Sequence, residues 1–307
     1  MEYTLHQLEI FKKVAELKSV TLAAKSLYLT QPAISIQLKK LQDQFSQPLF
    51  EIIGRQLYIT DFGKEVVIHA EKILNEVEEL NTYTSNLSGQ LTGKLKIALV
   101  STAKYVMPYF LTDFIHAHKG VTLAMDVTNK ASVINSLEKN LVDFALVSLV
   151  PEDKNIHSIQ LMKNKLYLIG GRNYESDKSI ISKKQMAQLP MLYRENGSAT
   201  RLLMETYMRK NNLPITKRLE LTSNEALKQA IIAGLGYSIM PLIGIKNELE
   251  TGDIQIIPAK GLPMETNWQL IWLKSKRLSP TAKAYTEYLR EKGDEIINKH
   301  FSWYEKH

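Results

Sequence analysis

Apolar residues recur at helical spacing through the first 60 residues of the chain. On a first predicted helix they share one face and are Leu5, Leu8, Phe11 and Ala15. A second short helix follows Ser19 and a third follows Thr30. Residues 49–60 change to the shorter period of β structure and contain Gly54, which predicts two short strands joined by a turn. The pattern therefore predicts three short helices followed by a β hairpin.

Residues 61–88 form one long helical pattern, for which Asp61 is the predicted N-cap. Its seam positions alternate in steps of four and three and are Val66, Ala70, Ile73, Val77, Leu80, Thr84 and Leu87. Either the helix covers the core of its own domain, or it pairs with the same helix of a second copy. The strict heptad spacing, and the lack of an adjacent core to cover, favour a dimer seam formed by Val66, Ala70, Ile73, Val77, Leu80 and Leu87.

After a polar, glycine-containing break at residues 85–93, strand and helix patterns alternate. The predicted strands are residues 94–100, 121–127, 143–149, 165–171, 218–222, 236–241 and 265–274. The predicted helices begin near Ala103 and Ala131 and cover residues 198–212, 223–233 and 279–298. This alternation predicts a mostly parallel sheet with helices on both faces.

Composition adds limits to this picture. With 307 residues, 44% of them hydrophobic and 23% charged, the chain has the composition of a folded protein of two domains or so. It contains no cysteine, which excludes disulfides and cysteine-ligated metal sites. The sequence has no secretory signal pattern and no run of about 18 apolar residues. We therefore expect a cytoplasmic protein that does not enter a membrane.

The formal charge of +7 is unevenly distributed. A basic protein suggests a nucleic-acid partner, yet residues 1–90 carry 9 Lys and Arg against 11 Asp and Glu. Residues 91–307 carry 30 against 21. DNA affinity must then rest on a few placed cations and helix-end amides, whereas the C-terminal surplus favours a small anionic ligand.

Residues 20–39 have the features of a helix-turn-helix. Ala23 and Ala24 are small enough for two helices to cross closely, and residues 28–30 form the tight turn between them. Thr30 caps the second helix, whose first turn accommodates Pro32. Its buried stripe is predicted as Ile34, Leu38, Leu41 and Phe45. The outward face is then left with Pro32, Ser35, Ile36, Lys39 and Lys40.

This stretch resembles the N-terminal domain of the LysR-type transcriptional regulators, and the resemblance continues across the rest of the chain. The string LTQPAISIQLKKL (29–41) matches the recognition helix of that family, and Arg55 matches the arginine that members place against the DNA backbone. The resemblance implies a winged helix-turn-helix. Its implied contacts with double-stranded DNA are Thr30, Gln31, Pro32, Ala33, Ser35, Ile36, Lys39 and Arg55.

Ile36 and Ile52 depart from the family pattern, in which most members have arginine at these positions. An apolar side chain at position 36 lacks the cation that would contact phosphate or guanine, but it suits contact with thymine methyl groups. We therefore hypothesise a preference for A·T-rich sites. A helix-turn-helix used for protein contact is the alternative. The hairpin and the long helix that follow in order favour DNA binding.

The resemblance also implies a division of the chain into three parts. These are a DNA-binding domain (1–60), a linker and dimerisation helix (61–90), and an α/β effector domain of the two-lobed periplasmic-binding-protein type (91–307). Crossings near residues 162 and 267 would divide the effector domain into a first lobe (91–162 and 268–307) and a second lobe (163–267).

Polar residues stand where strands end and helices begin in this domain, the place where such a fold binds an anion. They are Ser101, Thr102, Asn129, Ser148, Ser198, Thr200, Arg201 and Asn224. Taken alone, each Ser, Thr or Asn is better explained as a helix cap. Their convergence on one cleft favours a pocket for a carboxylate- or phosphate-bearing metabolite, with Arg201 as a charge partner.

Within the family, three strings resemble regulators of carbon-fixation operons: VSTAKYVMPYFLTDF (100–114), LYRENGSATRLLMETYM (192–208) and SNEALKQAIIAGLGYSIMP (223–241). The implied partners are promoter DNA, a small anionic metabolite, a second copy in a homodimer or dimer of dimers, and RNA polymerase. No cofactor or metal is expected. The alternative is an α/β enzyme in residues 91–307, but no P-loop, nucleophile-elbow serine or dinucleotide-binding loop supports it, so we expect no enzymatic activity.

Overall fold

The computed structural model describes residues 2–54, 56–86, 91–151, 155–174, 179–215 and 219–306. The chain forms two compact units, Met1–Gly89 and Gln90–His307, each with buried hydrophobic clusters of its own. No helix among the described residues is long and apolar enough to cross a membrane.

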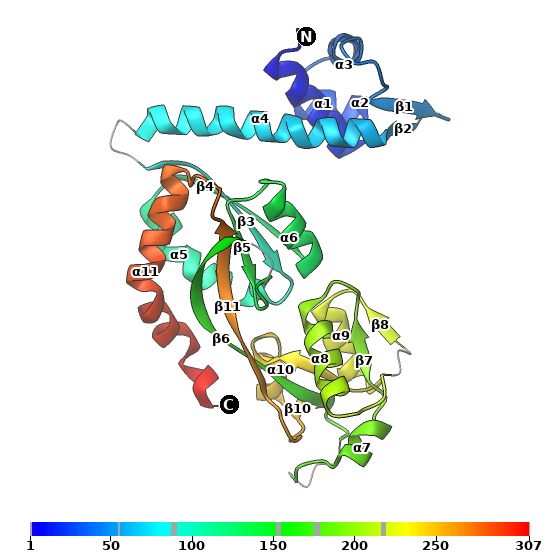
Figure 1. Ribbon diagram of the computed structural model, residues 1–307, viewed down its shortest axis with the longest axis vertical. Helices are drawn as coiled ribbons and strands as arrows, with labels where there is room; N and C mark the ends of the chain where they lie inside the picture. Colours follow the sequence, from blue (N-terminus) through cyan, green and yellow to red (C-terminus); the bar gives the residue numbers. More distant parts are fainter. Residues whose placement is uncertain are drawn as a thin grey trace. The chain divides into compact units, whose positions relative to one another are not determined.

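The first unit opens with three short helices, α1 (Leu5–Leu17), α2 (Val20–Ser26) and α3 (Gln31–Gln42) (Figure 1). Each begins at a hydroxyl cap, because the side chains of Thr4, Ser19 and Thr30 accept hydrogen bonds from free backbone amides of the first turn. The strands β1 (Phe50–Ile53) and β2 (Gln56–Ile59) follow as an antiparallel hairpin. The predicted helix-turn-helix and hairpin are confirmed.

The three helices share one core. Ala23 and Ala24 are buried where α2 packs on α1 and α3, and their small side chains permit that close packing. The larger core side chains of these helices are Leu8, Ile10, Phe11, Val14, Ile34, Leu38 and Leu41. Phe45, predicted to complete the buried stripe, is only partly buried and packs against the edge of this cluster.

The long helix α4 (Asp61–Asn86) is capped by Thr60 and not by Asp61. The Thr60 hydroxyl accepts a hydrogen bond from the Gly63 amide at 2.9 Å, and its carbonyl accepts the Lys64 amide, also at 2.9 Å. The predicted N-cap was therefore wrong by one residue. Asp61 lies in the first turn, where its carboxylate pairs with Lys64 at 2.7 Å.

The first half of α4 covers the helix-turn-helix core. Ala70 is buried, and the partly buried side chains beside it are Phe62, Val66, Val67 and Leu74. An ion pair of 3.6 Å between Lys12 and Glu71 adds to the contact with α1. The expectation that α4 has no core of its own to cover was thus wrong for this part of the helix, because it packs along α1 and joins the same apolar cluster.

The second unit is built on one seven-stranded sheet with the order β10-β6-β11-β5-β3-β4, to which β9 adds by pairing with β6. The strands are β3 (Thr92–Val100), β4 (Gly120–Thr128), β5 (Phe144–Val147), β6 (Ile156–Gly171), β9 (Ser238–Pro241), β10 (Ile254–Ile256) and β11 (Met264–Leu273). Only β3 with β4 and β3 with β5 are parallel pairs in this sheet.

The predicted mostly parallel sheet is therefore corrected to a mixed one. The strand β6 is 16 residues long and pairs antiparallel with β11, β9 and β10, while β11 also pairs antiparallel with β5. These two strands run through both ends of the unit (Figure 1). Because each carries the chain from one lobe into the other, their opposite directions force the antiparallel pairing.

Helices cover both faces of the β3, β4 and β5 part of the sheet, which we call the first lobe. The helices α5 (Met107–Ala117) and α6 (Lys130–Glu138) lie on opposite faces (Figure 1), as right-handed connections require for this strand order. The long helix α11 (Pro280–Phe301) packs beside α5. Short 3-10 turns, η1 (Ala103–Tyr105) and η3 (Ser302–Lys306), flank these helices.

The other end of the unit, the second lobe, carries a short parallel pair of β7 (Leu192–Arg194) and β8 (Leu219–Leu221). Its helices are α7 (Lys183–Gln188), α8 (Ala199–Lys210), α9 (Asn224–Ile232) and α10 (Lys246–Thr251), with the 3-10 turn η2 (Leu242–Gly244). A separate apolar cluster of this lobe includes Tyr193, Met204, Tyr207 and Ile239.

Candidate functional site

The helix α3 presents a polar and partly apolar face to solvent. Its inner side is held by the buried Ile34, Leu38 and Leu41. The side-chain amide of Gln7 also donates a hydrogen bond of 3.1 Å to the side-chain oxygen of Gln37. On the outer side the Gln31 side chain donates to the Ser35 hydroxyl at 2.9 Å, which orders both groups. The helix therefore offers a fixed row of groups that fits the width of a DNA major groove.

The predicted DNA contacts lie on this outer face. Thr30, Gln31, Pro32, Ile36 and Lys39 are exposed, whereas Ala33 and Ser35 are half-buried. Ile36 is 56% exposed, a large value for an isoleucine in a well-packed unit. Arg55 lies outside the described residues. In the hairpin, Ile52, Ile53 and Tyr58 are exposed beside Glu51 and Gln56, so the described part of the wing presents apolar side chains among polar ones.

The predicted dimer seam is divided between two environments. Ala70 is 1% exposed in the core of its own unit, and Val66 packs against that core. Further along α4, Ile73 and Leu80 are 39% and 63% exposed, and Val77 is half-buried. Leu87 lies outside the described residues. The second half of the seam is thus the part that a partner could cover.

In the first lobe, the predicted polar residues gather at the carboxyl ends of the parallel strands. Ser101 and Thr102 follow β3, Ser148 follows β5, and Asn129 follows β4. Because β3 lies between β4 and β5 and the connections leave on opposite faces, this edge of the sheet opens as a crevice. Thr102 and Ser148 are buried, Ser101 and Asn129 half-buried, and Asn129 also caps α6.

In the second lobe, Ser198 caps α8, and Thr200 and Arg201 lie buried in its first turn. The Arg201 guanidinium pairs with Glu205 at 2.9 Å and with Glu220, and it donates to the Arg194 carbonyl at 2.9 Å. Burial opposes the charge, but the hydrogen bonds to both carboxylates outweigh it and raise the pKa of Arg201. Arg201, predicted as a charge partner for a ligand, is thus already matched by two carboxylates.

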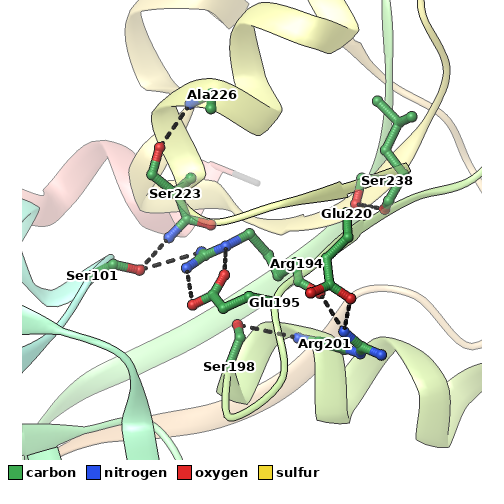
Figure 2. A network of polar contacts seen from close by, with 11 residues as sticks. Ser101, Arg194, Glu195, Ser198, Arg201, Glu220, Ser223, Ala226 and Ser238 are labelled. Carbon is green, nitrogen blue, oxygen red and sulfur yellow. Dashed lines mark hydrogen bonds and ion pairs between the residues drawn. The ribbon is translucent and has the colours of Figure 1, made fainter. Parts of the chain in front are cut away.

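A second buried guanidinium, that of Arg194, escaped the sequence analysis. Arg194 ends β7 and is 2% exposed. Figure 2 shows it between Ser101 and Glu195: Nη1 donates to the Ser101 hydroxyl at 3.2 Å, and the Glu195 carboxylate accepts from Nε at 2.8 Å and Nη2 at 2.9 Å. Its place at the end of a strand could have identified it, but residues 192–194 were not among the predicted strands.

The two lobes meet at Ser101. Its hydroxyl accepts the Arg194 hydrogen bond and a second one from the Asn224 side chain, at 2.8 Å, which reaches it from the start of α9. Asn224 is 3% exposed, and its Oδ1 is buried without a hydrogen-bond partner in the part of the chain that the structure describes. A single first-lobe hydroxyl thus joins two polar side chains of the second lobe.

A cavity of about 520 Å³ lies between the lobes. Another, of about 360 Å³, lies beside Lys228 and Trp303. The walls of the cavity between the lobes come from α6, including Lys130 and Glu138, and from residues 196–198 with the first turns of α8. Gly197 has a φ of +83°, and a Cβ there would stand 3.1 Å from the Cβ of Ala131. Glycine therefore permits the close approach of the lobes at this point.

One further buried group lies nearby. The Tyr193 hydroxyl has no hydrogen-bond partner among the described residues, and burial, with the charge of Glu205, raises its pKa. Among those residues no group of three or more His, Asp or Glu side chains could hold a metal ion. The junction of the lobes therefore offers hydroxyls, amides and two buried guanidiniums, each of which is paired with at least one carboxylate.

Comparison with known proteins places both units. The family model "Bacterial regulatory helix-turn-helix protein, lysR family" matches residues 5–64, and "LysR substrate binding domain" matches residues 88–294. The RuBisCO operon transcriptional regulator of Allochromatium vinosum is 35% identical over 290 residues, which cover 94% of this chain and 96% of that protein.

Two solved structures agree with this placement. The regulatory domain of CcmR from Synechocystis PCC6803, in complex with 2-PG, is 30% identical, with a TM-score of 0.62 over 64% of this chain and 96% of that one. CbnR, a LysR family transcriptional regulator, matches 95% of this chain and 99% of its own with a TM-score of 0.72 and 20% identity, which shows the fold. The enzyme alternative for residues 91–307 is thereby set aside, and the chain belongs to the LysR family of bacterial helix-turn-helix transcription regulators.

Proposed function

We propose that this regulator binds promoter DNA through α3 and the wing, and that a small anionic metabolite bound between the two lobes modulates this binding. The observation that carries the proposal is the Arg194 guanidinium, buried at the lobe junction and shared with Ser101 beside Asn224. A buried guanidinium next to hydroxyls and amides is suited to a carboxylate or phosphate.

The relatives support an anion and suggest the genes. CcmR, at 30% identity, has been solved with 2-PG in its regulatory domain, and the Allochromatium relative regulates a RuBisCO operon. We propose a 2-PG-like metabolite and target genes of carbon fixation. The effector pocket between the lobes would use the predicted polar groups, with Arg201 beside them. These groups are Ser101, Thr102, Asn129, Ser148, Ser198, Thr200 and Asn224.

We further propose that the molecule works in the cytoplasm as a homodimer or dimer of dimers, and that it contacts RNA polymerase at the promoter. The exposed Ile73 and Leu80, with Val77 between them, support a seam on α4 from Ile73 onwards. Two copies would present two α3 helices, which suits a site made of two half-sites.

The proposed domain boundaries follow the architecture. They are a DNA-binding domain (1–60), a linker helix (61–90), and an effector domain (91–307) whose lobes are 91–162 with 268–307 and 163–267. Support for the lobe boundary comes from the register of the crossing strands, in which Met162 lies opposite Trp268.

The test of this function is selection of genomic fragments by the full-length protein, followed by footprinting of the selected DNA. We expect protection of two half-sites separated by a whole number of helical turns, upstream of a small set of genes. Uniform, sequence-independent protection would contradict the proposed promoter binding. So would the absence of any retained fragment at low salt, where DNA affinity is greatest.

A further inference from the structure

We propose that Glu195 occupies the anion subsite of the effector cleft as a tethered carboxylate, and that an anionic effector binds by displacing it from Arg194. This rests on the proposed function, because it concerns how the same cleft accepts its ligand. Glu195 makes a two-pronged contact with the guanidinium, through Nε and Nη2, which is the geometry that a free carboxylate or phosphate would adopt there.

The two partners differ in their freedom to move. The Arg194 side chain is 2% exposed and is also held by Ser101, whereas the Glu195 side chain is 14% exposed. The Glu195 backbone is fixed by its amide, which donates to the Leu221 carbonyl at 3.2 Å. Only the Glu195 side chain is therefore free to turn towards solvent while the guanidinium stays in place.

Charge balance decides what ligand permits that movement. Arginine remains protonated at any physiological pH, and a buried cation without a counterion is strongly unfavourable. Glu195 can leave only when another anion arrives, so a neutral ligand cannot make the exchange. Arg194 has a counterion both before and after the exchange. The observed free energy of ligand binding is therefore the difference between the free energies with which the ligand and the tethered carboxylate interact with the guanidinium.

Asn224 supplies a second recognition group. Its Nδ2 donates to Ser101 at 2.8 Å, but its buried Oδ1 has no hydrogen-bond partner in the described part of the chain. A buried acceptor of this kind is costly unless a donor reaches it. An effector that carries a hydroxyl or a protonated phosphate oxygen besides its anionic group would satisfy this atom.

Arg201 has a different part in this arrangement. It is paired with both Glu205 and Glu220, and it donates to the carbonyl of Arg194 at 2.9 Å. Figure 2 shows Arg201 beside Glu220. We assign it as a positioning residue that fixes the end of β7, so that the exchangeable counterion belongs to Arg194. Glu220 therefore offers a matched control, because it is also a carboxylate on a buried arginine of the same cleft.

The experiment is calorimetric titration of the full-length protein and its Glu195→Gln variant with 2-PG, inorganic phosphate and, as a neutral control, glycerol. We expect the variant to bind both anions about tenfold or more tightly than the wild type, as removal of one competing ion pair implies. The factor should be nearly the same for the two anions, because the displaced group is the same. The Glu220→Gln control should bind both within about twofold of the wild type.

Each other outcome counts against a defined part of the account. Anion binding that is unchanged or weaker in Glu195→Gln overturns the role of Glu195 alone. If Glu220→Gln instead binds the anions more tightly than the wild type, the anion subsite lies at Arg201. If neither the wild type nor the variant binds any anion, the anionic-effector part of the proposed function fails as well, while DNA binding stands. If Glu195→Gln does not fold, Glu195→Asp replaces it, because this variant keeps the charge but shortens the side chain that reaches Arg194. It must still bind both anions more tightly than the wild type does.

Discussion

Ile36 is 56% exposed at the centre of the outer face of α3, a position at which the family pattern has arginine in most members. We predict that Ile36→Arg abolishes a preference for A·T-rich half-sites and steepens the dependence of DNA affinity on salt. The reason is that an apolar contact with thymine methyls is replaced by a cation that reaches phosphate or guanine. Selection from random DNA, and binding measured across a salt series, would show both changes.

The matched control is Leu5→Arg, which adds the same charge at a 45% exposed position on α1. It should leave base preference as in the wild type. If Ile36→Arg changes neither base preference nor the salt dependence, apolar readout by Ile36 is wrong.

Thr60 is the residue on which the start of α4 depends, through its hydrogen bond from the Gly63 amide. We predict that Thr60→Ala lowers the free energy of unfolding of the N-terminal unit by about 1–2 kcal/mol, the usual effect of losing a cap. Thr60→Ser should retain most of it. Urea unfolding followed by circular dichroism measures the difference, and a larger loss from Asp61→Ala than from Thr60→Ala would return the cap to Asp61.

Single residues were predictable from the sequence where their role is local. Thr30 as a cap and Ile34, Leu38 and Leu41 as a buried stripe follow from helix periodicity and capping chemistry alone. Arg194 was not predictable, because its importance arises from Ser101, 93 positions earlier in the chain. Arg201 was predicted as a charge partner for an anionic ligand, but the carboxylates that neutralise it, Glu205 and Glu220, are brought to it by the fold.

At the scale of elements, α4 serves two purposes along its length. It buries Ala70 against the helix-turn-helix, and further along it exposes Ile73 and Leu80. We predict that Ile73→Asp with Val77→Asp weakens self-association of the full-length protein at least tenfold, because a charge inside an apolar seam loses its hydration. Sedimentation velocity over a range of protein concentrations measures this directly.

A control with two acidic substitutions on the same helix, Lys64→Asp with His69→Asp, uses exposed positions off the seam. It should associate as the wild type does. A seam variant that associates as strongly as this control would refute the role of α4 in dimerisation.

Element prediction succeeded where local pattern decides the structure and failed where long-range pairing decides it. The helices of the first unit and the strand β3 were predicted within a few residues. The strand β6 was predicted only from residue 165, although it begins at Ile156, because polar and exposed residues interrupt the apolar ones in its first half, which is held by pairing with β11. The mixed sheet follows from that same pairing.

At the scale of the whole molecule, the charge distribution separates two tasks. Residues 1–90 have a net charge of −2, and residues 91–307 have a net charge of +9. The basic surplus therefore does not lie in the unit that carries α3, and DNA affinity must come from placed contacts and from doubling by a second copy. The overall charge suggested a nucleic-acid partner, but it identified the wrong part of the chain as its source.

The central claim is that an anion between the lobes and promoter DNA on α3 are energetically coupled. The most direct test measures DNA affinity with and without saturating 2-PG, and 2-PG affinity with and without saturating promoter DNA, at one fixed salt concentration. We predict that the two ratios are equal, because coupling between two sites is reciprocal, and that each differs from one by about fivefold or more. Binding of both ligands with ratios of one would contradict it.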